Sequence, residues 1–147
     1  MRTISNLISS QRKLDVLFEL ENAMIDTERD FIELQKEQLF AGERSDGKNI
    51  FNIKTGSDEY SERYAQYKGK LRPIDLHDKG DFYQGIFADA RDIGFFVDSS
   101  DIKSADLQRR YGEEIFGLGD DRLQEYIYQL SPVLIKNVEN SLNATAL

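Results

Sequence analysis

Residues 11–40 read QRKLDVLFELENAMIDTERDFIELQKEQLF, and this stretch decides the fold. It contains no Gly or Pro, and it is rich in Leu, Glu, Lys and Gln, which favour helices. Apolar pairs recur every seven residues, at Leu17/Phe18, Met24/Ile25 and Phe31/Ile32. This spacing places the pairs on one helical face. The pattern predicts one long helix over about residues 11–40, with Ser9 or Ser10 as N-cap and Gly42 as its stop.

Polar residues interrupt this apolar face. Glu21, Glu28 and Gln35 also recur at intervals of seven and project onto the middle of the stripe. A carboxylate in a buried face needs a cationic or hydrogen-bonding partner. Two interpretations stay open: the Glu side chains reach solvent over a shallow face, or they meet Arg or Lys from elsewhere in the fold or from a neighbouring subunit.

The length of this helix is a second anomaly. Thirty helical residues span about 45 Å, whereas a compact domain of this chain length is roughly 38 Å across. We therefore expect the helix either to kink or to project beyond its own domain and pack on something else.

Shorter patterns follow in the middle of the chain. A second helix is predicted over about residues 58–68, capped by Ser57 or Asp58 and stopped at Gly69. Three tyrosines recur on one of its faces, at Tyr60, Tyr64 and Tyr67. Such a stripe is typical of a core or an interface.

A hairpin and two helices complete the pattern. Two apolar runs, residues 82–88 and 94–98, flank a polar turn and predict an antiparallel hairpin. A short helix is expected over 104–111 and a long one from Asp120, which Pro132 should kink or divide.

Together these elements predict an α+β fold. We expect one domain over residues 1–147, in which the long N-terminal helix and the C-terminal helix pack on a small antiparallel sheet.

Composition excludes several classes of protein. The chain has 147 residues, a net charge of -8 and no Cys, which excludes a disulfide scaffold, a thiol nucleophile and a Cys-based zinc site. Residues 74–147 carry 7 basic and 14 acidic side chains, and this net charge of -7 repels phosphate. We expect no sequence-specific binding of nucleic acid. No apolar run approaches the roughly 18 residues of a membrane span, so no membrane association is expected.

No pattern of residues predicts catalysis. His77 is the only His, which is too few for a zinc site or a Ser-His triad. Asp75, Asp78 and Asp81 are the best metal candidates, although Asp-rich turns more simply cap their own backbone. We therefore predict no catalytic, cofactor-binding or metal-binding residues.

Four motifs in a fixed order carry a family resemblance. They are Gln38-Leu39-Phe40-Ala41-Gly42 with Asp46-Gly47; Leu76-His77-Asp78-Lys79-Gly80-Asp81-Phe82-Tyr83; Asp98 with Asp101-Ile102-Lys103; and Tyr111-Gly112-Glu113-Glu114-Ile115-Phe116-Gly117-Leu118. Behind a long N-terminal helix, this order resembles small virion-morphogenesis proteins of tailed bacteriophages, of the head–tail joining, neck or tail-completion type.

The resemblance implies a structural role without catalysis. It implies a multimeric ring at the capsid–tail junction, in contact with other neck, connector or tail proteins. The protein would reside in the virion, and in the host cytoplasm during assembly. The candidate interface residues are Glu21, Glu28, Tyr60, Tyr64, Tyr67, Phe82, Tyr83 and Phe116.

Two other functions stay open. One is a small acidic binding module, such as a phage-encoded inhibitor of a basic partner. The other is a metal-dependent enzyme that uses Asp75, Asp78 and Asp81.

Overall fold

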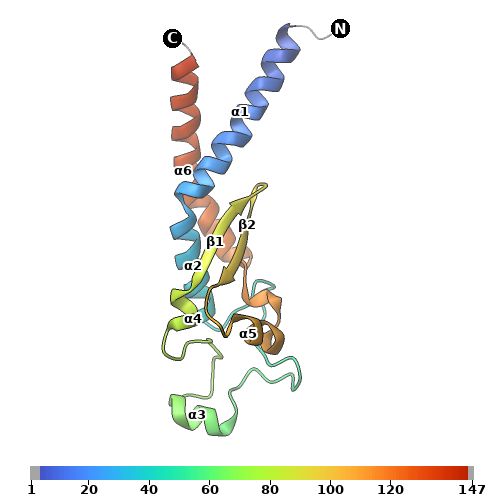
Figure 1. Ribbon diagram of the computed structural model, residues 1–147, viewed down its shortest axis with the longest axis vertical. Helices are drawn as coiled ribbons and strands as arrows, with labels where there is room; N and C mark the ends of the chain where they lie inside the picture. The colour runs from blue at the N-terminus through green and yellow to red at the C-terminus, as the bar shows by residue number, and fades with distance from the viewer. Residues whose placement is uncertain (1–3, 146–147) are drawn as a thin grey trace.

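The computed structural model describes residues 4–145, and within them the side chains outside 6–15 and 144–145. The elements in chain order are α1 (Ile4–Asp26), α2 (Glu28–Phe40), α3 (Glu62–Lys68), α4 (Asp81–Gln84), β1 (Ile86–Arg91), β2 (Gly94–Ser99), α5 (Ser104–Tyr111), a 3-10 turn η1 (Glu113–Ile115) and α6 (Asp120–Thr145). The fold is α+β, as the sequence predicts. The molecule is elongated: α1 and α6 extend past the hairpin at one end, and α3 lies at the other (Figure 1).

The long N-terminal helix is divided at Thr27, which agrees with the kink that its length led us to expect as one of two alternatives, although the pattern over 11–40 did not place the break. It begins at Ile4, ends at Asp26 and resumes at Glu28. Between the two helices lies Thr27, which is 2% exposed. Its hydroxyl donates to the carbonyl oxygen of Ala23 at 2.7 Å and lies 2.8 Å from the hydroxyl of Tyr126. A Thr that bonds back to the preceding turn bends a helix, and here the contact with α6 fixes the bend.

Two adjoining hydrophobic clusters form the core. One lies in the lower body and centres on the fully buried Leu39, Ile50 and Ile115. The other joins α1, α2, α6 and the inner face of the hairpin. At its centre the ring of Phe31 lies 4.3 Å from that of Phe95 and 5.3 Å from that of Tyr126. Both the N-terminal helices and α6 therefore pack on the sheet.

The sheet is a two-stranded antiparallel hairpin with Ala88 opposite Val97. A two-residue turn, Asp92-Ile93, joins the strands, and both residues have positive φ, at 47° and 61°. Such a turn matches the twist of the strands it connects. The prediction that residues 82–84 belong to the first strand was wrong, because they form α4. Gly80, with φ of 93°, turns the chain into this short helix.

Other boundaries differ in smaller ways. The helix α3 begins at Glu62 rather than near Asp58, because Ser61 is the N-cap and accepts from the backbone N–H of Tyr64 at 3.4 Å. α5 spans 104–111 as expected. α6 runs through Pro132 as one helix rather than two. Pro132 is exposed, so water can bind the carbonyl group that it leaves without a helical donor.

Two buried glutamines of α2 hold the loop that leads into α6. Gln35 donates to the carbonyl oxygen of Ile115 at 3.1 Å and accepts from the N–H of Gly117 at 2.7 Å. Gln38 donates to the carbonyl oxygen of Gly117 at 2.8 Å and accepts from the N–H of Gly119 at 2.7 Å. Both glutamines are at most 1% exposed. The two side chains therefore pair with alternate residues of the loop as a neighbouring strand would.

We expect Gln35→Ala to lower the free energy of unfolding by about 2 kcal/mol, because it leaves the buried carbonyl of Ile115 and the half-buried N–H of Gly117 without their partner. Urea denaturation would measure this loss. The matched control is Gln124→Ala, at an exposed position of α6, which should change stability by less than about 0.5 kcal/mol. Equal effects of the two substitutions would contradict the role given to Gln35.

Candidate functional site

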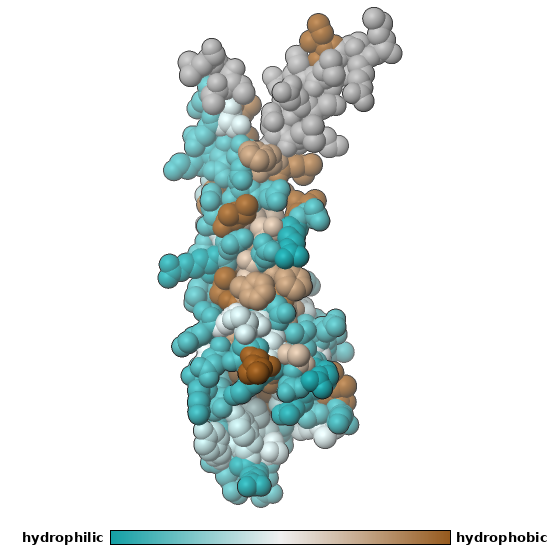
Figure 2. Space-filling model, viewed as in Figure 1, coloured by the Kyte–Doolittle hydropathy of each residue, from teal (hydrophilic) through white to brown (hydrophobic). Residues whose placement is uncertain are grey.

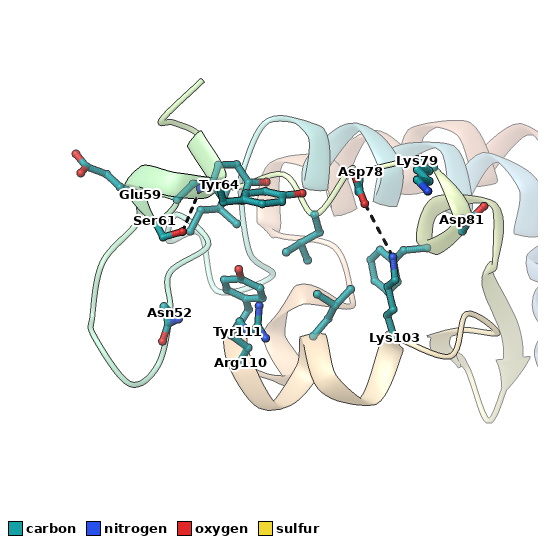
Figure 3. Close-up of a pocket in the computed structure, with 16 residues that line it drawn as sticks. Asn52, Glu59, Ser61, Tyr64, Asp78, Lys79, Asp81, Lys103, Arg110 and Tyr111 are labelled. Carbon is teal, nitrogen blue, oxygen red and sulfur yellow. Dashed lines mark hydrogen bonds and ion pairs between the residues drawn. The ribbon is translucent and has the colours of Figure 1, made fainter. Parts of the chain in front are cut away.

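A pocket of about 460 Å³ opens between α3, the segment 74–82 and α5. Three of the predicted interface residues line it: Tyr60, Tyr64 and Phe82. Leu107 and Tyr111 of α5 also line it, and Tyr111 lies across the pocket from Tyr64 (Figure 3). The tyrosine stripe and the motif that begins at Leu76 therefore meet, although neither pattern alone indicates the other.

The remaining aromatic candidates lie around this pocket. The ring of Tyr64 is 5.0 Å from that of Tyr60 and 5.8 Å from that of Tyr67, which is 71% exposed. The centroid of the Phe116 ring lies 5.8 Å from that of the Phe82 ring. Tyr83 is buried and donates its hydroxyl proton to the carbonyl oxygen of Asp75 at 2.5 Å. Of these residues, Tyr67 alone presents most of its surface to an incoming partner.

Asp75 is a buried anion held by several donors. Lys68 and Lys70 each pair with one of its carboxylate oxygens. The hydroxyl of Tyr60 donates at 2.8 Å and the N–H of His77 at 3.0 Å. Burial by itself raises the pKa of Asp75, but these donors outweigh it and lower the pKa to about 2. Asp75 therefore ties α3 to the segment 74–82.

The same burial acts on the neighbouring phenols. Desolvation raises the pKa of both Tyr60 and Tyr83, and the negative charge of Asp75 adds to the effect. Both tyrosines therefore keep their protons at neutral pH and serve as hydrogen-bond donors to Asp75.

The rim of the pocket carries charges of both signs. Asp78 lies 4.0 Å from the ammonium group of Lys103, across the mouth of the pocket (Figure 3). Glu59 pairs with Arg72 outside the pocket. These pairs neutralise the acidic rim in part. They leave aromatic surface beside charged groups, an arrangement suited to binding a side chain of another protein.

The three aspartates considered as metal ligands do not converge. Asp75 is not among the residues that line the pocket and pairs with two lysines, whereas Asp78 and Asp81 line it. Within residues 4–145, no group of three or more His, Cys, Asp or Glu side chains is arranged to hold a metal ion. The proposed metal-dependent use of this segment therefore lacks a ligand set among the described residues.

Glu21 and Glu28 occupy different environments. Glu21 is exposed on α1. Glu28 is half-buried, and its carboxylate accepts from the backbone N–H of Ala90 at 3.3 Å. In the described part of the chain no ion pair of either residue is found, so Glu21 fits the interpretation in which the side chain reaches solvent, and a cation from a neighbouring subunit stays a prediction for both. Glu28 instead binds a backbone group at the edge of the sheet.

A second surface of interest lies on the projecting helices. Large apolar side chains are exposed on α1 at Phe18 (62%) and Ile25 (49%), and on α6 at Tyr128 (82%) and Ile135 (57%). Each pair is spaced by seven residues and so shares one helical face. Apolar atoms are visible on α1 directly below the grey segment, in a surface that is otherwise largely hydrophilic (Figure 2). We call these four residues the exposed helix faces.

The comparisons with known proteins give no further guide: no family model, curated protein or solved structure matches this chain. In residues 4–145, no helix combines the length and the apolar character needed to cross a membrane.

Sequence reasoning missed several residues that build the site. It passed over the lysines that bind Asp75, at positions 68 and 70, and it passed over Arg44, whereas Gln38 was named only as the first residue of a motif. The spacing of Lys68, Lys70 and Asp75 within eight residues was the available signal for the first group. Arg44 is 5% exposed and bridges Asp46 at 2.9 Å to Glu114 at 3.1 Å. No local pattern indicates that long-range bridge.

The lowered pKa of Asp75 predicts a specific acid dependence. Because the folded-state pKa of about 2 lies below the ordinary value of 3.8, ionised Asp75 stabilises the fold above about pH 4. This contribution is lost as the pH falls from about 4 to 2, and it amounts to at most about 2 kcal/mol. Asp75→Asn removes it and lowers stability at pH 7. The difference in free energy of unfolding between wild type and Asp75→Asn should therefore shrink by about 1–2 kcal/mol between pH 5 and pH 2.

Urea denaturation across this pH range checks the prediction. Asp92→Asn, at the exposed hairpin tip, is the matched carboxylate-to-amide control and should follow wild type within about 0.5 kcal/mol. A difference between wild type and Asp75→Asn that stays constant down to pH 2 would contradict the assignment.

Proposed function

We propose that this chain is a non-enzymatic structural subunit of a tailed-phage virion, which acts at the capsid–tail junction as a neck or tail-completion protein. It associates with copies of itself and with neighbouring neck, connector or tail proteins. The observation that carries the proposal is the pair of projecting helices, whose exposed helix faces are left uncovered by the chain's own fold.

The helix α6 has apolar side chains on two different sides. Its first half buries Tyr126 and Leu130 against the second core cluster. Tyr128 and Ile135 point to a different side and are mostly exposed. A surface helix of a self-contained domain needs only one apolar stripe. A second stripe on a projecting helix indicates a protein partner.

The helix α1 supplies a matching surface. Phe18 and Ile25 flank Glu21, and all three lie on the exposed side of α1. If α1 of one subunit packs on α6 of the next, the contact is heterologous, and such contacts close into rings when the rotation between subunits allows. Glu21 would lie within this contact, as the sequence analysis proposes for an adjacent subunit.

The phage assignment is supported by the ordered motifs and by the charge of the chain. Two of the motifs meet in the structure: the segment that begins at Leu76 lines the pocket, and Tyr111 of the last motif also lines it. The net charge of -7 on residues 74–147 would let DNA pass a ring without adhering. These features fit a virion protein that is made in the host cytoplasm and incorporated during assembly.

A small acidic binding module is the second candidate. It is favoured by the overall charge of -8 and by the aromatic pocket, which a monomer could use to hold a basic partner. The oligomeric state separates the two, because an inhibitor of this kind would act as a monomer or dimer.

We expect the protein to self-associate as its concentration rises. Phe18→Glu or Ile135→Glu should raise the protein concentration needed for association roughly ten-fold or more, because each substitution would bury a charge in the contact. Sedimentation velocity measures this. Ile102→Glu is the matched control, because Ile102 is 95% exposed but lies outside both helices.

A wild-type chain that stays a 17.0 kDa monomer at several hundred micromolar would contradict the proposal and favour the acidic binding module. An equal effect of Ile102→Glu would show that the exposed helix faces are not the contact.

A further inference from the structure

The hairpin has two backbone edges, and the pairing pattern shows which groups line each edge. Ser100 donates its N–H to the carbonyl oxygen of Gly85 at 2.9 Å, just beyond the paired strands. Hydrogen-bonded pairs alternate with non-hydrogen-bonded pairs in an antiparallel ladder. Within each of the pairs Phe87/Asp98 and Asp89/Phe96, the two residues therefore exchange backbone hydrogen bonds. The intervening residues point their backbone groups outward, to the free edges of the sheet.

The edge of β1 is already occupied. Its outward N–H at Ala90 donates to the carboxylate of Glu28 at 3.3 Å, which confirms the alternation. The strand lies between α2 and β2 (Figure 1) and contacts both α2 and α1. Glu28 therefore closes this edge with a charged acceptor, one of the ways in which proteins prevent unwanted strand pairing.

The edge of β2 has no such cover. Its outward groups are the N–H and carbonyl groups of Phe95 and Val97, and among the described residues no hydrogen bond of these groups is found. β2 reads GFFVDS and contains no Lys, no Pro and no bulge, which are the usual protections of an edge strand. Its single charge, Asp98, is held by the hydroxyl of Ser104 at 2.7 Å.

The outer face of the hairpin beside this edge is aromatic. Phe96 is 47% exposed and Phe87 39%, and their rings lie 6.2 Å apart on the face turned away from the core. The side chains of Phe95 and Val97 pack against the second core cluster on the other face. The strand is therefore held rigidly while its edge and one aromatic ring stay accessible.

We infer that the edge of β2 pairs antiparallel with β2 of a second copy, about a two-fold axis beside Phe96. In this register Phe95 of each copy lies opposite Val97 of the other. Both residues point their N–H and carbonyl groups outward, so the two positions exchange four hydrogen bonds. The two hairpins then form one four-stranded sheet, a form of strand addition.

The outward N–H and carbonyl groups of β2 favour a second copy of this chain as the partner. Two antiparallel β2 strands present donors and acceptors that match each other. The two Phe96 residues face each other as a non-hydrogen-bonded pair, the closer type of cross-strand neighbour, so their rings can pack together. Gly94 of one copy falls opposite Asp98 of the other. Since Gly94 has no side chain, this position adds no steric obstacle to the pairing, while Arg91 of each copy stays paired with its own Asp89 and over the ring of its own Phe96.

A single introduced cysteine tests this register. The chain has no Cys, so Phe96→Cys supplies its only thiol. Non-hydrogen-bonded partners have Cα atoms about 4.5 Å apart, within the range of about 4.4–6.8 Å that a disulfide requires. Under mild oxidation of the full chain, Phe96→Cys should form a covalent dimer on a non-reducing gel roughly ten-fold faster than the controls.

Two controls fix the interpretation. Phe87→Cys lies on the same aromatic face but on β1, where the proposed register places the two copies too far apart to bridge. Ile102→Cys is almost fully exposed and reports random collision. Similar rates for all three variants, or no dimer from Phe96→Cys, would overturn the inference and leave the edge to a segment of a different protein.

A measurement on the unmodified chain covers the case in which Phe96→Cys fails to fold. Hydrogen exchange of the Phe95 and Val97 amides should slow as protein concentration rises, while the Ala88 amide on the covered edge stays unchanged. No dependence on concentration at Phe95 and Val97 would overturn the pairing. This contact uses neither α1 nor α6, so its failure leaves the proposed function untouched, and Ile135→Glu should not affect the crosslink.

Discussion

The structure depends on the side-chain amides of Gln35 and Gln38. They form hydrogen bonds with the backbone of the loop before α6, as a neighbouring strand would. The loop after α5 runs through the buried Ile115 and the half-buried Gly117 and Gly119, and the two glutamines supply partners for its backbone groups. α2 supplies those partners from successive turns of one helical face. The first residues of α6 follow immediately, so the bonds to the loop also set where α6 begins.

The turn after α2 is also bonded to this region. Arg44 bridges to Glu114, and the N–H of Ser45 donates to the carbonyl oxygen of Glu114 at 2.8 Å. The lower body is therefore closed by polar contacts between segments about 70–80 residues apart in the chain. At the upper end, α1 and α6 separate towards their free ends (Figure 1). Because these helices leave large apolar side chains exposed, we propose that assembly uses the helices and the sheet edge rather than the pocket.

The sequence predicts the parts of this fold that local chemistry determines. The helix of residues 104–111 and the strand pairing around Asp92 follow from periodicity and turn residues alone. Gln35 was recognised as a polar interruption of an apolar face, but its partner is the backbone of a loop 80 residues away, and no local pattern identifies that loop. The division at Thr27 has neither Gly nor Pro to signal it and depends on Tyr126 of α6. Likewise, the sequence left open whether Glu28 reaches solvent or meets a cation, and its backbone partner belongs to a sheet edge that exists only after the hairpin packs on α2.

Native-state hydrogen exchange at Gly117 and Gly119 tests the central claim most directly. Their N–H groups are the ones that Gln35 and Gln38 hold. If these bonds fix the loop as described, both amides should exchange only through global unfolding. Their exchange free energies should then match those of the α2 core amides at Leu34 and Leu39 within about 1 kcal/mol. Fast exchange at the two glycines, while the α2 amides stay protected, would contradict the account.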